Sequence, residues 1–268
     1  TLRSHPILGR AKAVIIETDK GSSLPELPAP DVFNEFIDIS KYGAKAIRDA
    51  ISDAGIVGMG GAGFPTRVKL EPNPEMPKDV IVINGCECEP FITCDYRVML
   101  EWTRQVVIGI KLASIAADCH DVRIGIEDNK PLAIKAFKKA LSITPDTDNI
   151  EITVLRTKYP QGGERQLINA VTGKKVPSGG IPPIIGVVVL NIETCAAIAD
   201  AVVRARPLTH RVVCVTGRAI TNPGNYYIPI GTSVADIIAA CGGIKENTAT
   251  VIMGDRKSTR LNSSHRIR

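Results

Sequence analysis

Short apolar runs alternate with helix-like stretches through the middle of this chain, and this alternation constrains the fold more than any other feature. A short continuous apolar run predicts a buried strand over 79–85, and further strands are predicted over 121–128, 149–156 and 185–191. Between them, apolar residues recur at helical spacing. Strands that alternate with helices build a mainly parallel sheet. We therefore predict an α/β fold with a Rossmann-like parallel sheet.

The predicted helices cover 45–55, 95–117, 129–142, 164–171 and 193–205. The first has Ile47, Ile51 and Ala54 on one face and ends at Gly55. The third begins with Asn129 as a plausible N-cap and has Pro131 in its first turn. The second is long, with an apolar stripe made of Met99, Val106, Ile110, Ala113 and Ala117.

The pattern changes after Pro207. The segment "RVVCVTGRAITNPGNYYIPIGTSVADIIAACGGI" predicts a strand, an Asn-Pro-Gly turn, a second strand and a short helix, which is typical of a small β-grasp α+β domain. Near the start, 11–19 predicts a strand followed by a Pro-rich linker. We expect four parts: the end of an N-terminal domain plus linker (1–35), the α/β domain (36–206), an incomplete β-grasp domain (207–255) and a non-native tail (256–268).

Charge argues against a nucleic-acid partner. The last thirteen residues hold five of the 33 Lys and Arg residues and no acid, so the preceding 255 residues carry 28 of each sign. A neutral body with only 4% aromatic residues lacks the basic, stacking surface that binds nucleic acids. A basic arm is the alternative for the tail. Prolines and acids interrupt the most apolar stretch, 181–203, which excludes a membrane span there.

Cysteine usage indicates a reducing compartment and no metal site. The seven cysteines form no C-x-x-C pair, so neither a zinc ribbon nor a bacterial ferredoxin cluster is encoded. His120 and His210 have no partner at ligand spacing. The chain begins at Thr1 without a Met or a targeting segment, and we expect it to be an internal fragment.

The segment "GIVGMGGAGFPT" (55–66) matches the G-x-G-x-x-G pattern at Gly58, Gly60 and Gly63. A dinucleotide fingerprint requires a strand before the glycines and a helix opening at the last one. Here a predicted helix precedes the loop and Phe64-Pro65 follows it, so the pattern matches and its context does not. Two interpretations stay open: an anion-binding nest with Lys69 as its cation, or a flexible loop.

Four polar segments at strand ends favour the first interpretation, although a surface turn with solvated acids is the alternative for the first of them, 83–97. They cover 83–97, 159–168, 176–183 and 190–199. Ligands bind at the carboxyl ends of strands in open α/β sheets. The polar side chains offered there are Asn84, Glu87, Glu89, Tyr159, Glu164, Asn191 and Thr194.

Five segments together carry a resemblance to a known family: "GMGGAGFPTRVK", "INGCECEPFITCDYRVMLE", "YPQGGERQLI", "GIPPIIGVVVLNIET" and "VTGRAITNPGNYYIPIGTS". The chain resembles the RnfC family of Rnf ion-translocating electron-transport complexes. It resembles more distantly the FMN-binding 51-kDa subunit of respiratory complex I. The resemblance implies an FMN/NADH-binding α/β domain, followed by a soluble-ligand-binding β-grasp (SLBB) domain and preceded by a barrel-sandwich domain.

By matching motifs, the resemblance also implies site residues. FMN would contact Gly58, Gly60, Gly61, Ala62, Gly63, Phe64, Lys69, Asn84, Asn191 and Thr194. NADH would contact Phe64, Glu87, Glu89, Tyr159 and Glu164. Hydride passes directly from NADH to the cofactor, so no catalytic protein acid or base is expected. Cys86 departs from the family pattern, and we interpret Cys86 and Cys88 as structural thiols.

For the full-length protein, the resemblance implies electron transfer from NADH through FMN to two [4Fe–4S] clusters, coupled to ion translocation. The cluster motifs are absent from this sequence. The implied partners are the other Rnf subunits, with ferredoxin or RnfB as electron partner, at the cytoplasmic face of the bacterial inner membrane. The alternatives are a cobalamin reductase of a bacterial microcompartment and a non-catalytic nucleotide-binding scaffold.

Overall fold

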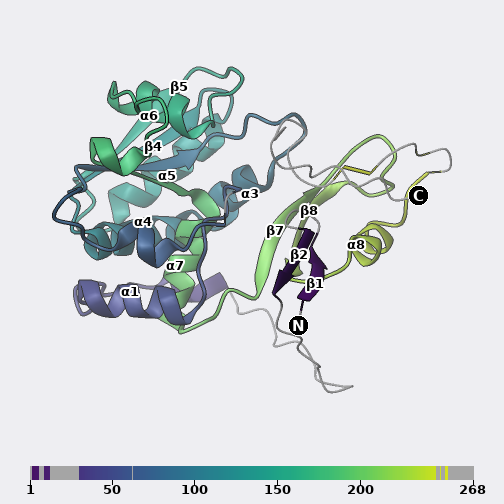
Figure 1. The fold of residues 1–268 in the computed structure, drawn as a ribbon, viewed down its shortest axis with the longest axis horizontal. Helices are drawn as coiled ribbons and strands as arrows, with labels where there is room; N and C mark the ends of the chain where they lie inside the picture. The colour runs from purple at the N-terminus through teal and green to yellow at the C-terminus, as the bar shows by residue number, and fades with distance from the viewer. Residues whose placement is uncertain are drawn as a thin grey trace.

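The computed structural model describes residues 2–5, 9–12, 30–61, 63–245, 248 and 251–252. An α/β domain lies beside a smaller module (Figure 1). The α/β domain contains a four-stranded sheet in the order β5–β4–β3–β6, with every neighbouring pair parallel. Its strands are β3 (Val80–Gly85), β4 (Asp121–Glu127), β5 (Ile150–Leu155) and β6 (Val187–Asn191). The predicted fold class is confirmed.

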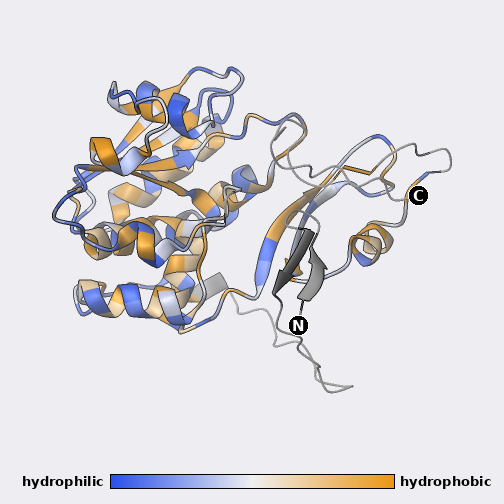
Figure 2. Cartoon of the chain, viewed as in Figure 1, coloured by the Kyte–Doolittle hydropathy of each residue, from blue (hydrophilic) through white to orange (hydrophobic). Residues whose placement is uncertain are grey.

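Helices cover both faces of this sheet. On one face lie α4 (Thr103–Ala117), α5 (Pro131–Ile143) and α7 (Ile192–Arg204), with α1 (Ala44–Asp53) packed against α4 and α7. On the other face lies α6 (Glu164–Thr172). Successive β3 residues point to opposite faces, so Ile81 joins the first core and Val82 the second. This double burial explains the continuous apolar runs, which appear orange in Figure 2.

Helices α4 and α7 cross at very close range. A Cβ atom built on Gly109 of α4 would lie 1.8 Å from the Cys195 carbonyl oxygen of α7. Only glycine allows the two backbones to approach this closely. The approach fixes the position of α7, whose first turn forms part of the site described below.

The predicted helix over 95–117 is wrong as one element. It is divided at Trp102 into α3 (Cys94–Glu101) and α4, because Trp102 leaves the helical region at φ −116° and ψ 26°. The Thr103 hydroxyl donates to the Met99 carbonyl at 2.6 Å and so competes with the helical backbone at the break. All five residues of the predicted stripe are buried.

The other boundaries agree closely with the sequence, with one correction at a helix start. The residue before α5 is Lys130, whereas Asn129 is one position too early to cap it; Pro131 is the first helical residue. Helix α1 ends before Gly55, which has φ +67°. Three further short elements are α2 (Thr66–Leu70) and the 3₁₀ turns η1 (Pro30–Asn34) and η2 (Pro182–Ile185).

The smaller module has the predicted order of strand, strand and helix. Strands β7 (His210–Val215) and β8 (Gly224–Pro229) pair antiparallel, and α8 (Val234–Ala240) follows with Ser233 as its N-cap. At the N-terminus, β1 (Leu2–His5) pairs with β2 (Gly9–Lys12). Most of the predicted strand over 11–19 and all of 256–268 lie outside the described residues.

Within the described ranges, we find no helix that is both long enough and apolar enough to cross a membrane. The predicted boundaries between the four parts of the chain remain predictions.

Candidate functional site

The order of the sheet changes direction between β3 and β6. From β3 the chain builds β4 and then β5 to one side, and it returns to place β6 on the other side of β3. A change of strand order leaves a crevice at the carboxyl ends of the two adjoining strands, where ligands bind in open α/β sheets. Asn84, the penultimate residue of β3, and Asn191, the last residue of β6, are partners in the parallel register.

The glycine loop connects α1 to α2 and has a closed base. Val57 and Pro65 form an isolated antiparallel bridge, and the Gly58 amide donates to the Phe64 carbonyl at 2.8 Å. Gly61 has φ +133° and Gly63 has φ +63°, a region that side-chain-bearing residues rarely adopt. Ala62 lies outside the described residues. The glycines are therefore required by the shape of the loop.

This loop lies against the first turn of α7. The Met59 amide donates to the Thr194 hydroxyl at 3.0 Å, and a Cβ on Gly60 would come within 3.3 Å of the Asn191 Cβ. The amides of Gly60, Gly61 and Gly63 donate no hydrogen bond to any other described residue. Free, adjacent amides of this kind are what a phosphate requires.

The side chains of the two asparagines are held by hydrogen bonds to neighbouring turns. The Asn191 carbonyl oxygen accepts from the Glu193 and Thr194 amides and caps α7, while its Nδ2 donates to Asp95 at 2.7 Å. The Asn84 Nδ2 donates to the Gly162 carbonyl at 3.0 Å. Each amide nitrogen has two hydrogens, so one remains for a ligand.

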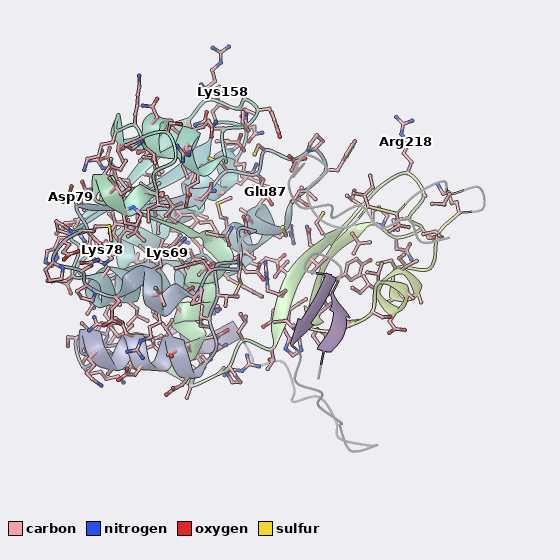
Figure 3. The ribbon with its side chains drawn as sticks, in the orientation of Figure 1. Lys69, Lys78, Asp79, Glu87, Lys158 and Arg218 are labelled. Atoms are coloured by element: carbon pink, nitrogen blue, oxygen red, sulfur yellow. The ribbon has the colours of Figure 1, made fainter. Side chains whose placement is uncertain are left out.

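Lys69 supplies a cation close to the loop. It extends from α2 across the outer edge of β6, where its ammonium donates to the Val189 carbonyl at 2.9 Å (Figure 3). Burial lowers the pKa of Lys69, and the carboxylate of Glu164 opposes that effect. A half-buried cation that forms no ion pair with a carboxylate of the described residues is suited to an anionic ligand.

Glu87 is turned into the protein and caps α3. Its carboxylate accepts from the Asp95 amide at 2.8 Å and the Tyr96 amide at 3.1 Å, and its side chain is 3% exposed (Figure 3). The Lys130 ammonium lies 3.9 Å from Glu87 and 3.4 Å from Glu127. Burial raises the pKa of Glu87. A contact of Glu87 with NADH therefore stays a prediction, whereas its role in positioning α3 is observed.

Sequence reasoning missed Asp95, Glu127 and Lys130 in this region. Glu127 follows the same rule as Asn84, because it is a polar residue that ends a parallel strand. Nothing in the sequence points to Asp95, whose partner Asn191 is 96 positions away. Burial, with the Glu87 and Glu193 carboxylates nearby, raises the pKa of Asp95 to about 7.

Four of the predicted residues remain accessible at this edge. The Phe64 and Tyr159 side chains are each 48% exposed, Glu164 is exposed and Glu89 is half-buried. By contrast, Thr194 is fully buried behind the loop that it holds. The exposed rings suit a planar ligand. Thr194 supports the loop through its hydrogen bond with the Met59 amide, and a direct contact of Thr194 with FMN stays a prediction.

The prediction that 176–183 follows a strand is wrong. This segment follows α6 and leads into η2 and β6. Its carbonyls at Pro177 and Gly180 accept from the Arg165 guanidinium at 2.9 and 2.7 Å. Three of the four predicted segments therefore begin at the carboxyl edge of the sheet, and the fourth is tied to the start of α6.

The cysteines near the site are buried or partly buried thiols. Burial raises the pKa of Cys86 to about 12, and its sulfur lies 3.7 Å from the Gly125 carbonyl oxygen. Burial also raises the pKa of Cys88. In the part of the chain that the structure describes, no group of His, Cys, Asp and Glu residues is arranged to hold a metal ion. These features agree with structural thiols.

The residues present fit FMN. Gly60, Gly61 and Gly63 offer amides and Lys69 offers a positive charge, which together suit a phosphate. Asn84 and Asn191 are oriented by the fold and suit the polar groups of the nucleotide. A Cβ atom at Gly60 would lie 3.3 Å from the Asn191 Cβ, so a larger residue there would crowd Asn191.

Comparison with family models gives two matches. The model of the Nuo51 FMN-binding domain matches residues 51–200, and that of the SLBB domain matches residues 212–260. The first match includes the glycine loop and all three strand-end turns, and the second includes most of β7 with β8 and α8.

Curated relatives include three RnfC-type proteins, each named as the C component of an ion-translocating complex. That of the proton-translocating ferredoxin:NAD(+) oxidoreductase complex of Clostridium ljungdahlii is 45% identical over 93% of this chain and 53% of its own length. The Na(+)-translocating counterpart of Acetobacterium woodii is 41% identical over 94% of this chain and 55% of its own. The C component of the ion-translocating oxidoreductase complex of Salmonella arizonae is 41% identical over 94% of this chain and 36% of its own length. The chain thus spans about half the length of the first two.

Solved structures with a similar fold include the NAD+-reducing [NiFe]-hydrogenase. In its H2-reduced state one chain aligns with a TM-score of 0.67 and 25% identity, over 80% of this chain and 41% of that one. In the air-oxidised state the TM-score is 0.61 with 27% identity over the same shares.

Proposed function

The chain belongs to the family of the Nuo51 FMN-binding domain, and on this premise we propose that it is the FMN-binding, NADH-oxidising part of the RnfC component of an ion-translocating complex. The observation that carries the proposal is the hydrogen-bonded convergence of the glycine loop with the strand-end turns. Met59 bonds to Thr194, Asn191 to Asp95 and Asn84 to Gly162. These three contacts join segments that are far apart in sequence.

Binding of FMN supplies a group that takes hydride from NADH and passes electrons on one at a time. The chain's own contribution is binding and orientation. The amides of Gly60, Gly61 and Gly63 and the ammonium of Lys69 hold the phosphate, and Asn84 and Asn191 fix the orientation of the nucleotide. Phe64 and Tyr159, both half-exposed, provide aromatic surfaces beside the nicotinamide.

The acids have two different tasks in this proposal. Glu89 and Glu164 lie at the accessible side and border the nicotinamide nucleotide. Glu87 is committed to the amides of α3 and to Lys130, so it acts on the site by holding α3 in place. No protein group needs to accept the transferred hydride or a proton from NADH.

The wider role is proposed from the relatives' names. We propose that electrons leave the flavin for iron–sulfur clusters encoded outside this sequence and then reach ferredoxin or another protein of the complex. The protein would act at the cytoplasmic face of the membrane as a peripheral component. The coupled transport of protons or Na+ belongs to the assembled complex.

Anaerobic titration tests the core of this proposal. The full chain is loaded with FMN, and the flavin absorbance is followed as NADH is added without oxygen. We expect bleaching with one equivalent of NADH per bound FMN. Tight FMN binding without bleaching supports the non-catalytic scaffold instead, and failure to bind FMN contradicts the proposal altogether. Replacing NADH by NADPH provides a specificity control.

A further inference from the structure

Arg211 connects the smaller module to the glycine loop. It lies on β7, outside the residues that match the FMN-binding domain model. One terminal nitrogen of its guanidinium donates to the Met59 carbonyl at 2.9 Å, and its Nε donates to the Glu193 carboxylate at 3.2 Å. One side chain therefore joins the second module, the loop and the first turn of α7.

Both backbone polar groups of Met59 are hydrogen-bonded. Its amide donates to the Thr194 hydroxyl at 3.0 Å, and its carbonyl accepts from Arg211. That carbonyl belongs to the peptide bond that carries the Gly60 amide, so fixing its orientation also fixes the direction of the Gly60 N–H. The free amides of the loop begin at this residue.

Glu193 keeps Arg211 in position. Its side chain is 8% exposed, and it accepts from the Val212 amide at 2.6 Å as well as from Arg211. The Arg211 side chain is 32% exposed. The Arg211 guanidinium is already fixed by the Glu193 carboxylate. It therefore loses little side-chain entropy when it also binds the Met59 carbonyl.

The surrounding contact between the modules is closely packed. Tyr227 of β8 stacks on His210 with centroids 5.0 Å apart and meets the edge of Trp102 at 5.3 Å. Trp102, Glu193 and Tyr227 also line a small pocket of about 30 Å³ at this contact. Strand β7 is thus a firm support from which Arg211 reaches the loop.

We propose that Arg211 is a positioning residue, through which the smaller module holds the glycine loop in the shape that binds FMN. The inference rests on the proposed FMN site. It goes beyond the family match because it makes the affinity of the α/β domain for FMN depend on a side chain of the second module.

The test uses the full chain with Arg211→Gln combined with Glu193→Gln. Glutamine at 211 is too short to bridge both partners, and the second change avoids leaving a buried carboxylate unpaired. Glu193→Gln alone retains the Arg211 contact with Met59. Arg218→Gln is the matched control, since Arg218 lies on the same module and extends into solvent (Figure 3).

Two readouts separate this inference from the proposed function. In FMN-free protein, exchange of the hydrogen-bonded Gly58 and Met59 amides should become about tenfold faster in the double variant, as expected from the loss of one charge-assisted hydrogen bond. The Kd for FMN should rise by about tenfold for the same reason. Arg218→Gln should leave both within about twofold, whereas Glu193→Gln alone weakens the support of Arg211 but keeps its contact with Met59 and should have an intermediate effect.

Unchanged exchange and unchanged affinity in the double variant overturn the inference, even when the wild-type chain binds FMN well. If the wild-type chain does not bind FMN, the proposed function fails, and exchange in the FMN-free protein still decides whether Arg211 holds the loop. If the double variant unfolds, Arg211→Lys replaces it. A single ammonium retains the charge but cannot make both contacts in the plane of a guanidinium, so intermediate exchange is expected.

Discussion

Asn84 and Asn191 are register partners at the carboxyl ends of β3 and β6, and their amide groups bond to different turns. Asn84 holds Gly162 of the turn after β5, and Asn191 holds Asp95 at the start of α3. Two residues separated by more than a hundred positions thus join three turns at one edge of the sheet. This relationship is the structural centre of the proposed FMN site.

Asn191→Ala should affect both stability and FMN binding. Removing the amide takes away the cap of α7, and we expect the free energy of unfolding in urea to fall by about 1–2 kcal/mol. The Kd for FMN should rise as well. Ser233→Ala is a matched control, because it removes the cap of α8 in the smaller module and should destabilise that helix without changing the Kd. Equal effects of the two variants on FMN affinity would contradict the assignment.

Gly60→Ala tests the close approach of the loop to α7. The added methyl group would lie 3.3 Å from the Asn191 Cβ, so the loop must shift by a few tenths of an ångström. We expect the Kd for FMN, measured by flavin fluorescence, to rise by about tenfold. Gly43→Ala provides the control, since no other atom lies within 4 Å of the added methyl there. If both variants bind FMN like the wild type, the loop does not contact the cofactor.

Asp95 should give the stability of the FMN-free protein a defined pH dependence. Burial and the Glu87 and Glu193 carboxylates raise its folded-state pKa from 3.8 to about 7. The folded state therefore binds this proton more tightly, so the stabilisation is complete below about pH 4 and is lost as the pH rises toward 7. The unfolding free energy of the wild type minus that of Asp95→Asn should fall over this range, approaching about 1.4 kcal/mol per pH unit. A difference that is flat, or that rises with pH, argues against a buried, proton-binding Asp95.

Gly109→Ala tests the α4–α7 crossing that positions Asn191. Its methyl group would lie 1.8 Å from the Cys195 carbonyl oxygen, so the two helices must separate. We expect a loss of about 3 kcal/mol or more in urea unfolding, at the high end for a single substitution. Gly224→Ala on β8 adds a methyl group at ordinary contact distance, 3.4 Å from the Tyr226 ring, and should change stability much less. Similar stability of the two variants would show that the helices separate at little cost.

The elements of this fold were predictable because β3 and β6 are buried on both faces, which leaves apolar runs in the sequence between helix-like stretches. The break at Trp102 was not predictable, since the apolar stripe continues across it and the Thr103 hydroxyl acts only locally. Within the site, Asn84 and Asn191 followed from their positions at strand ends. Arg211 and Asp95 could not, because their roles depend on partners in distant elements. The inward orientation of Glu87 was equally hidden, since sequence does not reveal which helix a carboxylate caps.

The most direct test of the account compares FMN with riboflavin, which lacks the phosphate. The Kd of each ligand is measured by fluorescence for the wild-type chain, for Lys69→Met and for Lys138→Met, which alters an exposed lysine of α5. Lys69 lies at the proposed phosphate position, so the wild type and Lys138→Met should prefer FMN strongly. Lys69→Met should lose about tenfold or more of that preference while binding riboflavin normally. Equal affinity of the wild type for the two ligands, or an unchanged preference in Lys69→Met, would contradict the claim that this glycine loop and Lys69 hold the FMN phosphate.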